Sequence, residues 1–143
     1  MFLGTHMQKL DDKGRLILPA KFRDELSPGL VLTRGQENCL TLFPTTEFEA
    51  EHERIQNAPK TNKEARDYQR VFLSAAFADQ PDKQGRITVP HILRQYASLD
   101  REVAVIGMGN RVEIWDAPTW EEYLVGAQQA FAERENEVIP GVI

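Results

Sequence analysis

Asp11-Asp12-Lys13-Gly14-Arg15-Leu16-Ile17-Leu18-Pro19 returns 71 residues later as Asp82-Lys83-Gln84-Gly85-Arg86-Ile87-Thr88-Val89-Pro90. The same offset aligns Arg23 with Arg94. Residues 40–43 align with 112–115 at an offset of 72, because one residue has been gained. Two copies of one unit therefore make up most of the chain.

Each copy has the pattern strand, strand, short helix, strand, strand. In the first copy we expect strands at 3–10, 15–18, 30–33 and 39–43, from their apolar alternation and the polar segments between them. Gly14 suits a turn that needs a positive φ. Pro19 is expected at the first position of a helix, where a missing N–H costs nothing, and residues 20–26 are expected to continue that helix. The second copy repeats this pattern, with a helix that starts at Pro90 and a last strand over 111–115.

Further helices are predicted outside the repeated unit. Thr46-Glu47-Phe48-Glu49 has the spacing of a capping box and predicts a helix to about residue 57, and Thr61-Asn62-Lys63-Glu64 predicts the start of another. Asp116 can cap a closing helix. That helix has one apolar face, made of Trp120, Tyr123, Leu124, Ala127 and Phe131.

Four aromatic residues hold equivalent places where the last strand of each copy meets a helix: Phe43, Phe48, Trp115 and Trp120. We interpret them as core or subunit-interface residues rather than as base-stacking residues, because the same pattern sits at both junctions.

The duplication itself predicts the fold class. One unit alone would expose sheet edges and an apolar face, whereas two units related by an approximate twofold can cover each other. We expect a β-rich α+β fold with both Asp-x-x-Gly-Arg turns directed toward one pole. Residues 1–143 are expected to form a single compact domain. Its parts are repeat 1 at about 2–48, connecting helices at about 46–73, repeat 2 at about 72–120, and a C-terminal helix and tail at about 117–143.

Composition is that of a globular, cytoplasmic protein. The 143 residues are 41% hydrophobic, and no apolar run approaches the roughly 18 residues of a membrane span. The charge that sums to −5 is distributed unevenly along the chain, since residues 117–143 carry five acidic side chains and one basic side chain. The first repeat instead concentrates Lys9, Lys13, Arg15, Lys21 and Arg23. An acidic protein can therefore still present a local basic surface.

The paired turns, the opening Met1-Phe2-Leu3-Gly4 and the interposed helices resemble the MraZ family of bacterial transcriptional regulators over nearly the whole chain. The resemblance implies tandem swapped-hairpin units of the double-split β-barrel type, like those of AbrB and MazE proteins. It also implies a ring-shaped, octamer-like homo-oligomer. This oligomer would bind tandem repeats in double-stranded DNA upstream of its own division and cell-wall gene cluster, at the nucleoid. By the family's motif, Asp11, Arg15, Asp82 and Arg86 would be the signature positions.

The candidate DNA-binding residues are Lys13, Gly14, Arg15 and Arg86. An arginine or lysine beside a turn tip can contact phosphates, and arginine can read the acceptor edge of guanine. The alternative is that each arginine only pairs with the aspartate of its turn. Asp11, Asp82 and Gly85 are interpreted as structural residues of the turns.

Two other classes of function compete with DNA binding. For an enzyme or metal protein, His6, His52 and His91 lack ligand spacing and no Gly-rich phosphate loop follows a strand, so neither a cofactor nor a metal is expected. Cys39 is expected to be a small buried hydrophobe. An antitoxin or scaffold that binds a protein partner is the main alternative, because AbrB-like hairpins also occur in antitoxins.

Overall fold

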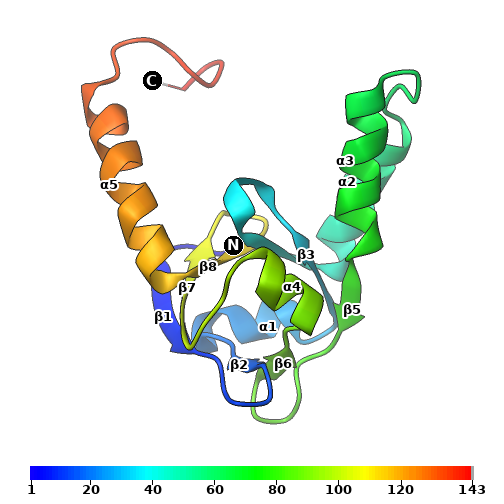
Figure 1. Ribbon diagram of the computed structural model, residues 1–143, viewed down its shortest axis with the longest axis vertical. Coiled ribbons are helices and arrows are strands. Elements are labelled where there is room, and N and C mark those ends of the chain that lie inside the picture. The colour runs from blue at the N-terminus through cyan, green and yellow to red at the C-terminus, as the bar shows by residue number, and fades with distance from the viewer. Residues whose placement is uncertain (143) are drawn as a thin grey trace.

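The computed structural model describes residues 1–142 and has an α+β fold with antiparallel sheets (Figure 1). A six-stranded sheet has the order β1 (Thr5–Lys9), β7 (Glu102–Gly107), β8 (Val112–Asp116), β4 (Leu40–Pro44), β3 (Leu30–Arg34) and β5 (Phe77–Asp79). A separate ribbon pairs β2 (Arg15–Ile17) with β6 (Arg86–Thr88). The strands expected in the first repeat all lie within two residues of these bounds.

The helices connect and flank these strands. They are the 3-10 turns η1 (Ala20–Phe22) and η2 (Gln36–Asn38) and the helices α1 (Arg23–Leu26), α2 (Thr45–Gln56), α3 (Lys63–Ser74), α4 (His91–Tyr96) and α5 (Ala117–Glu133). The helix expected over 20–26 is thus split into η1 and α1. No helix within residues 1–142 is long and apolar enough to cross a membrane.

Three predicted details of the helix starts were wrong. Pro19 and Pro90 take the N-cap position rather than the first helical one, with ψ of 136° and 150°. Pro44 plays the same part before α2, so Thr46 lies inside that helix and caps nothing. Asn62, rather than Thr61, caps α3, because its side chain accepts a bond from the backbone N–H of Glu64. The fixed φ of proline suits an extended residue as well as a helical one, so it fits a direct passage from strand to helix.

Strands are exchanged between the two repeats. β1 of the first repeat pairs with β7 of the second, which sets Thr5 opposite Ile106. β5 of the second repeat pairs with β3 of the first, and the ribbon sets Leu16 opposite Ile87. Neither repeat therefore completes a sheet by itself.

One face of the six-stranded sheet forms a core shared by both repeats. Leu40 and Leu42 on β4 lie opposite Ile114 and Val112 on β8, and all four are fully buried. Successive side chains alternate across a strand, so this set faces one side, where it packs with Leu16 and other residues of the ribbon. Burial of each such side chain contributes about 1.5–3 kcal/mol.

The opposite face of the sheet carries two separate apolar clusters. Trp115 packs edge-on against Trp120 with ring centroids 5.2 Å apart, and Phe43 packs against Phe48 at 5.9 Å. These are equivalent positions of the two repeats, and their predicted packing role is confirmed. Between the clusters lies Thr41, opposite Glu113 in the middle of the sheet.

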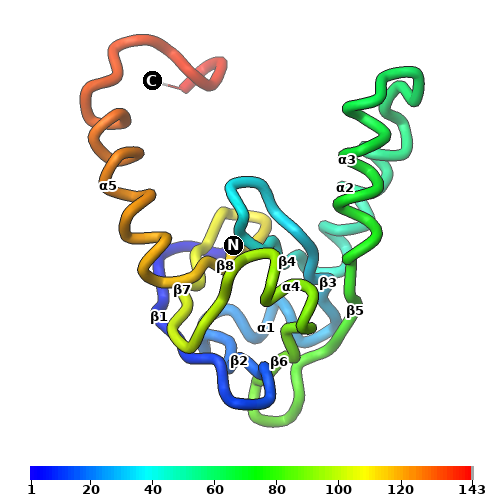
Figure 2. The backbone as a smooth tube through the Cα atoms, viewed as in Figure 1, coloured from blue at the N-terminus to red at the C-terminus, as the bar shows by residue number. Residues whose placement is uncertain are grey.

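Two helical arms rise from this face on opposite sides of the body (Figures 1 and 2). One arm is the hairpin of α2 and α3, and the other is α5. Asp116 caps α5 as predicted, accepting bonds from the N–H and hydroxyl of Thr119 at 3.3 and 2.8 Å. Both arms extend well beyond the strands that support them.

Candidate nucleic-acid interface

The first Asp-x-x-Gly-Arg turn is held by one carboxylate. Asp11 Oδ1 accepts bonds from the backbone N–H groups of Lys13 and Arg15, both at 2.9 Å, and Oδ2 accepts one from Arg15 Nε at 2.8 Å. Gly14 has a φ of +74°, which side-chain-bearing residues rarely adopt. The turn therefore depends on its aspartate and its glycine, and it fixes the position of Arg15.

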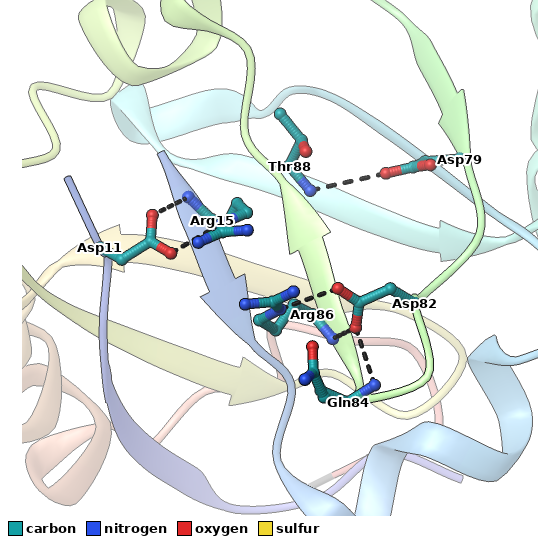
Figure 3. Close-up of polar contacts among 7 residues, drawn as sticks. All are labelled: Asp11, Arg15, Asp79, Asp82, Gln84, Arg86 and Thr88. Atoms are coloured by element: carbon teal, nitrogen blue, oxygen red, sulfur yellow. Dashed lines mark hydrogen bonds and ion pairs between the residues drawn. The ribbon is translucent and has the colours of Figure 1, made fainter. Parts of the chain in front are cut away.

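The second turn repeats this geometry (Figure 3). Asp82 Oδ1 accepts bonds from the N–H groups of Gln84 and Arg86 at 2.9 Å, and Oδ2 accepts Arg86 Nε at 2.7 Å. Gly85 has the same φ of +74°. The lysine of the first turn is Lys13, whereas that of the second is Lys83, one place earlier in the repeat. This difference leaves the backbone geometry of the turn unchanged.

These hydrogen bonds act on the acidity of the two aspartates. The backbone N–H of Arg15 is the largest cause that lowers the pKa of Asp11, and that of Arg86 is the largest cause for Asp82. Both carboxylates are exposed to solvent, which also favours the charged form, and both are ionised at neutral pH. An ionised acceptor holds the guanidinium more firmly than a neutral one.

Each aspartate takes only the Nε atom of its arginine. Among the described residues, the terminal nitrogens of Arg15 and Arg86 donate to no other protein group, and their side chains are 32% and 27% exposed. The planar fork of each guanidinium is thus oriented by the protein and left with donors for an external acceptor.

The ribbon brings the two turns to the same end of the molecule, as the predicted common pole requires (Figure 1). Beyond the three paired residues on each strand, Val89 N donates to Gly14 O at 2.8 Å and Leu18 N donates to Gly85 O at 2.9 Å. The glycine of each turn is therefore hydrogen-bonded to the strand end of the other repeat.

Arg23 aligns with Arg94 in the sequence, and no site role is predicted for either residue. In the structure each crosses to the turn of the other repeat: Arg94 lies against Gly14, and Arg23 against Gly85. Their Nε atoms donate to the carbonyls of Val89 and Leu18 at 3.0 and 3.1 Å. The offset of 71 could have singled out these two arginines, since it matches them as strictly as the turns, but it does not give their contacts with the glycines.

Cations predominate around the two turns. The two turns and the arginines packed against them contribute six basic side chains, which are Lys13, Arg15, Arg23, Lys83, Arg86 and Arg94. They contribute three acidic ones, which are Asp11, Asp12 and Asp82. This end is therefore locally basic although the whole chain carries −5. Such a surface suits a polyanion.

No competing chemical centre is found within residues 1–142. No group of three His, Cys, Asp or Glu side chains there could hold a metal ion. Burial raises the pKa of the Cys39 thiol to about 12, which leaves it protonated and a poor nucleophile.

Comparison with known proteins gives one consistent result. A family model described as "MraZ protein, putative antitoxin-like" matches the chain twice, over residues 1–71 and 72–139. A "Transcriptional regulator MraZ" of Kineococcus radiotolerans is 66% identical over 143 residues, which is 100% of both chains. Proteins of the same name from Clavibacter michiganensis subsp. michiganensis and Leifsonia xyli subsp. xyli are 65% and 63% identical over 142 residues, 99% of this chain.

Proposed function

This chain belongs to the MraZ family of transcriptional regulators, which is non-enzymatic, and we propose that it binds double-stranded DNA sequence-specifically through its two Asp-x-x-Gly-Arg turns. The observation that carries the proposal is the pair of equivalent turns at one end of the molecule, each with an oriented arginine that keeps free donors. Arginine in this state can donate two parallel bonds to guanine or to a phosphate.

Each residue of the turns has a proposed part. Arg15 and Arg86 donate to base edges or phosphates, and Lys13 contributes a mobile charge for the phosphate backbone. Gly14 supplies the positive φ that the turn needs and places its backbone at the turn tip beside the DNA. The carboxylates and the second glycine serve binding indirectly, because they fix the two arginines before DNA arrives.

We also propose that the exchanged strands form the swapped-hairpin, double-split barrel of AbrB-like proteins. Support comes from β1 and β5, which each join a strand of the other repeat, and from the β2–β6 ribbon between the repeats. The core shared by both repeats supports a single compact domain with the boundaries expected from sequence.

The proposed targets are tandem repeats upstream of the protein's own division and cell-wall gene cluster, bound at the nucleoid by a ring-shaped, octamer-like homo-oligomer. One chain offers few cations, and affinity for DNA rises with the number of phosphates neutralised. A ring that presents the turns repeatedly would convert weak single contacts into avidity.

Fluorescence anisotropy with DNA from upstream of the gene, against a shuffled sequence, tests the proposal. Arg15→Ala should lose the preference for the native DNA. The negative slope of log K against log salt should become shallower by about 0.9 for each phosphate that the variant no longer neutralises. Arg54→Ala is the matched control, because Arg54 is an exposed α2 residue paired with Glu51. Unchanged binding by Arg15→Ala would refute the assignment. Absence of binding by wild type, with a small basic protein co-purifying, would favour the antitoxin alternative.

A further inference from the structure

A cavity of about 630 Å³ lies on the face of the six-stranded sheet that carries the arms, and its size is that of a small-molecule site. Arg111 and Glu113 of β8 and Thr41 of β4 line it from the sheet, and side chains of α3 and α4 stand around them. The β2–β6 ribbon packs on the opposite face of the sheet. This sheet cavity is therefore separate from the two turns, and the proposed function makes no use of it.

The sheet contributes one cation and one anion that do not neutralise each other. Arg111 and Glu113 are two residues apart on β8 and share a face, yet neither forms an ion pair within the described chain. The Arg111 guanidinium makes one long bond there, from Nη1 to Asn110 Oδ1 at 3.4 Å. The Glu113 carboxylate accepts one bond at Oε1, from Trp115 Nε1 at 3.1 Å. Both groups therefore keep hydrogen-bonding positions for a ligand.

The other charged side chains of the lining are mostly engaged. Glu51 pairs with Arg54, and Asp67 pairs with Lys63 and Arg70. Arg34 donates to the carbonyl of Val71 at 2.8 Å and lies over the Tyr96 ring at 5.7 Å. Glu64 is exposed in the first turn of α3. Arg111 and Glu113 are thus the opposite charges that the sheet itself offers to the cavity.

A buried hydroxyl in the same lining also lacks a partner. Thr41 lies directly opposite Glu113 in the sheet, is 5% exposed, and its hydroxyl forms no hydrogen bond among the described residues. Thr33, its neighbour on β3, is equally buried, but its hydroxyl donates to the carbonyl of Phe72. Buried polar groups are nearly always hydrogen-bonded, so the Thr41 hydroxyl indicates a partner that comes from outside the chain.

Aromatic rings form an apolar wall beside these polar groups. Tyr68 stacks on Phe72 with ring centroids 5.8 Å apart, and Phe72 meets Phe43 edge-on at 6.2 Å. Tyr96 stands in the lining as well, held by a 2.6 Å bond from its hydroxyl to the carbonyl of Gly35. Rings that are fixed in this way suit an aromatic or a large aliphatic side chain.

We propose that the sheet cavity binds a free α-amino acid with an aromatic or large apolar side chain. Its carboxylate accepts bonds from Arg111, its ammonium group donates to Glu113, and its side chain lies against Tyr68 and Phe72. A simple anion or cation would leave one of the two sheet charges unanswered, whereas a zwitterion satisfies both. The site goes beyond the proposed DNA binding and does not depend on it.

Calorimetric titration of the full-length protein with L-phenylalanine and L-leucine tests the proposal. Two analogues are the matched controls: phenylalaninamide keeps the ring and the ammonium group, and 3-phenylpropionate keeps the ring and the carboxylate. Each should bind at least about tenfold more weakly than L-phenylalanine, because one charge-assisted contact is lost. Fluorescence of a Trp120→Phe protein locates the site, since the remaining indole, Trp115, donates to Glu113.

Four variants assign the contacts. Arg111→Gln and Glu113→Gln should each weaken L-phenylalanine by at least about tenfold, and glutamine at 113 still offers an acceptor to Trp115. Thr41→Val should weaken it several-fold without lowering the urea midpoint, because the hydroxyl has no bond within the described chain to lose. Arg101→Gln is the control. Arg101 is exposed and outside the cavity lining, so this change should leave the affinity as it is.

Several outcomes would overturn the inference. These are no saturable binding of either amino acid, equal binding of 3-phenylpropionate, unchanged affinity in both charge variants, or a weakened control. A second copy that fills the cavity in the assembled protein would give the first of these results. DNA anisotropy on the same samples separates the two proposals. DNA binding without amino-acid binding would defeat this inference alone, and the reverse result would defeat the proposed function alone.

Discussion

Replacement of Gly14 by alanine should lower the free energy of unfolding by about 2–3 kcal/mol. The φ of +74° alone costs a residue with a Cβ roughly 1–2 kcal/mol. The new Cβ would also stand 2.9 Å from Arg94 Cζ, so the guanidinium must move. That movement gives up the 3.0 Å bond from Arg94 Nε to Val89 O, which contributes about 1 kcal/mol.

Urea unfolding of wild type, Gly14→Ala, Arg94→Ala and the double variant measures both parts of this cost, the backbone strain and the lost Arg94 bond. In an Arg94→Ala background the steric part is absent, so Gly14→Ala should cost only about 1–2 kcal/mol there. Gly126→Ala on α5 is the matched control. Its new Cβ meets nothing within 4 Å, and alanine is the better helix former by about 1 kcal/mol. A Gly14→Ala protein as stable as wild type would refute the argument from strain, and equal costs in the two backgrounds would refute the argument from Arg94.

Three further predictions concern stability and reactivity. The pKa values of Asp11 and Asp82 are lower in the folded than in the unfolded chain, so their stabilising effect is present above about pH 4 and is lost as pH falls through the lowered values. The variant with both aspartates changed to asparagine should show a flatter acid limb in urea midpoints, and an unchanged limb would contradict this. Cys39, with its pKa near 12, should react slowly with a thiol reagent in the native protein and rapidly in urea; fast native labelling would count against its burial. Phe72→Ala should cost about 3–5 kcal/mol in chemical unfolding, since Phe72 joins α3 to the sheet, and a loss under about 1 kcal/mol would show that α3 packs otherwise.

The repeat explains why so much could be predicted from sequence. Two in-register copies of one turn identify Asp11 and Gly14 as residues that the turn itself requires. A requirement of this local kind can be recognised from the sequence alone. The common pole follows from the twofold that the duplication implies. The amphipathic face of α5 was likewise readable from its spacing.

The parts that escaped prediction are non-local. Nothing in the alternation of residues 5–9 says that they pair with residues 102–106 rather than with a strand of their own repeat. Arg94 lies against a glycine 80 positions earlier in the chain, a contact that no spacing rule encodes. Tyr123 is exposed because no helix within the described residues covers it, and periodicity shows which face is apolar but not what meets it.

The pairing of β1 with β7 also means that β1 remains unpaired during much of the synthesis of the chain. Thr5 and its partner Ile106 are separated by about 100 residues, which a ribosome needs roughly 5–20 s to translate. During that interval β3 and β4 can pair with each other, but the strands that flank them, β5 and β8, have not all been made. The nascent first repeat thus presents open sheet edges, the feature that invites wrong pairing. A transcript cut between the repeats would yield a first repeat with open sheet edges of this kind. Such a product would be a substrate for chaperones and proteases rather than a DNA-binding protein.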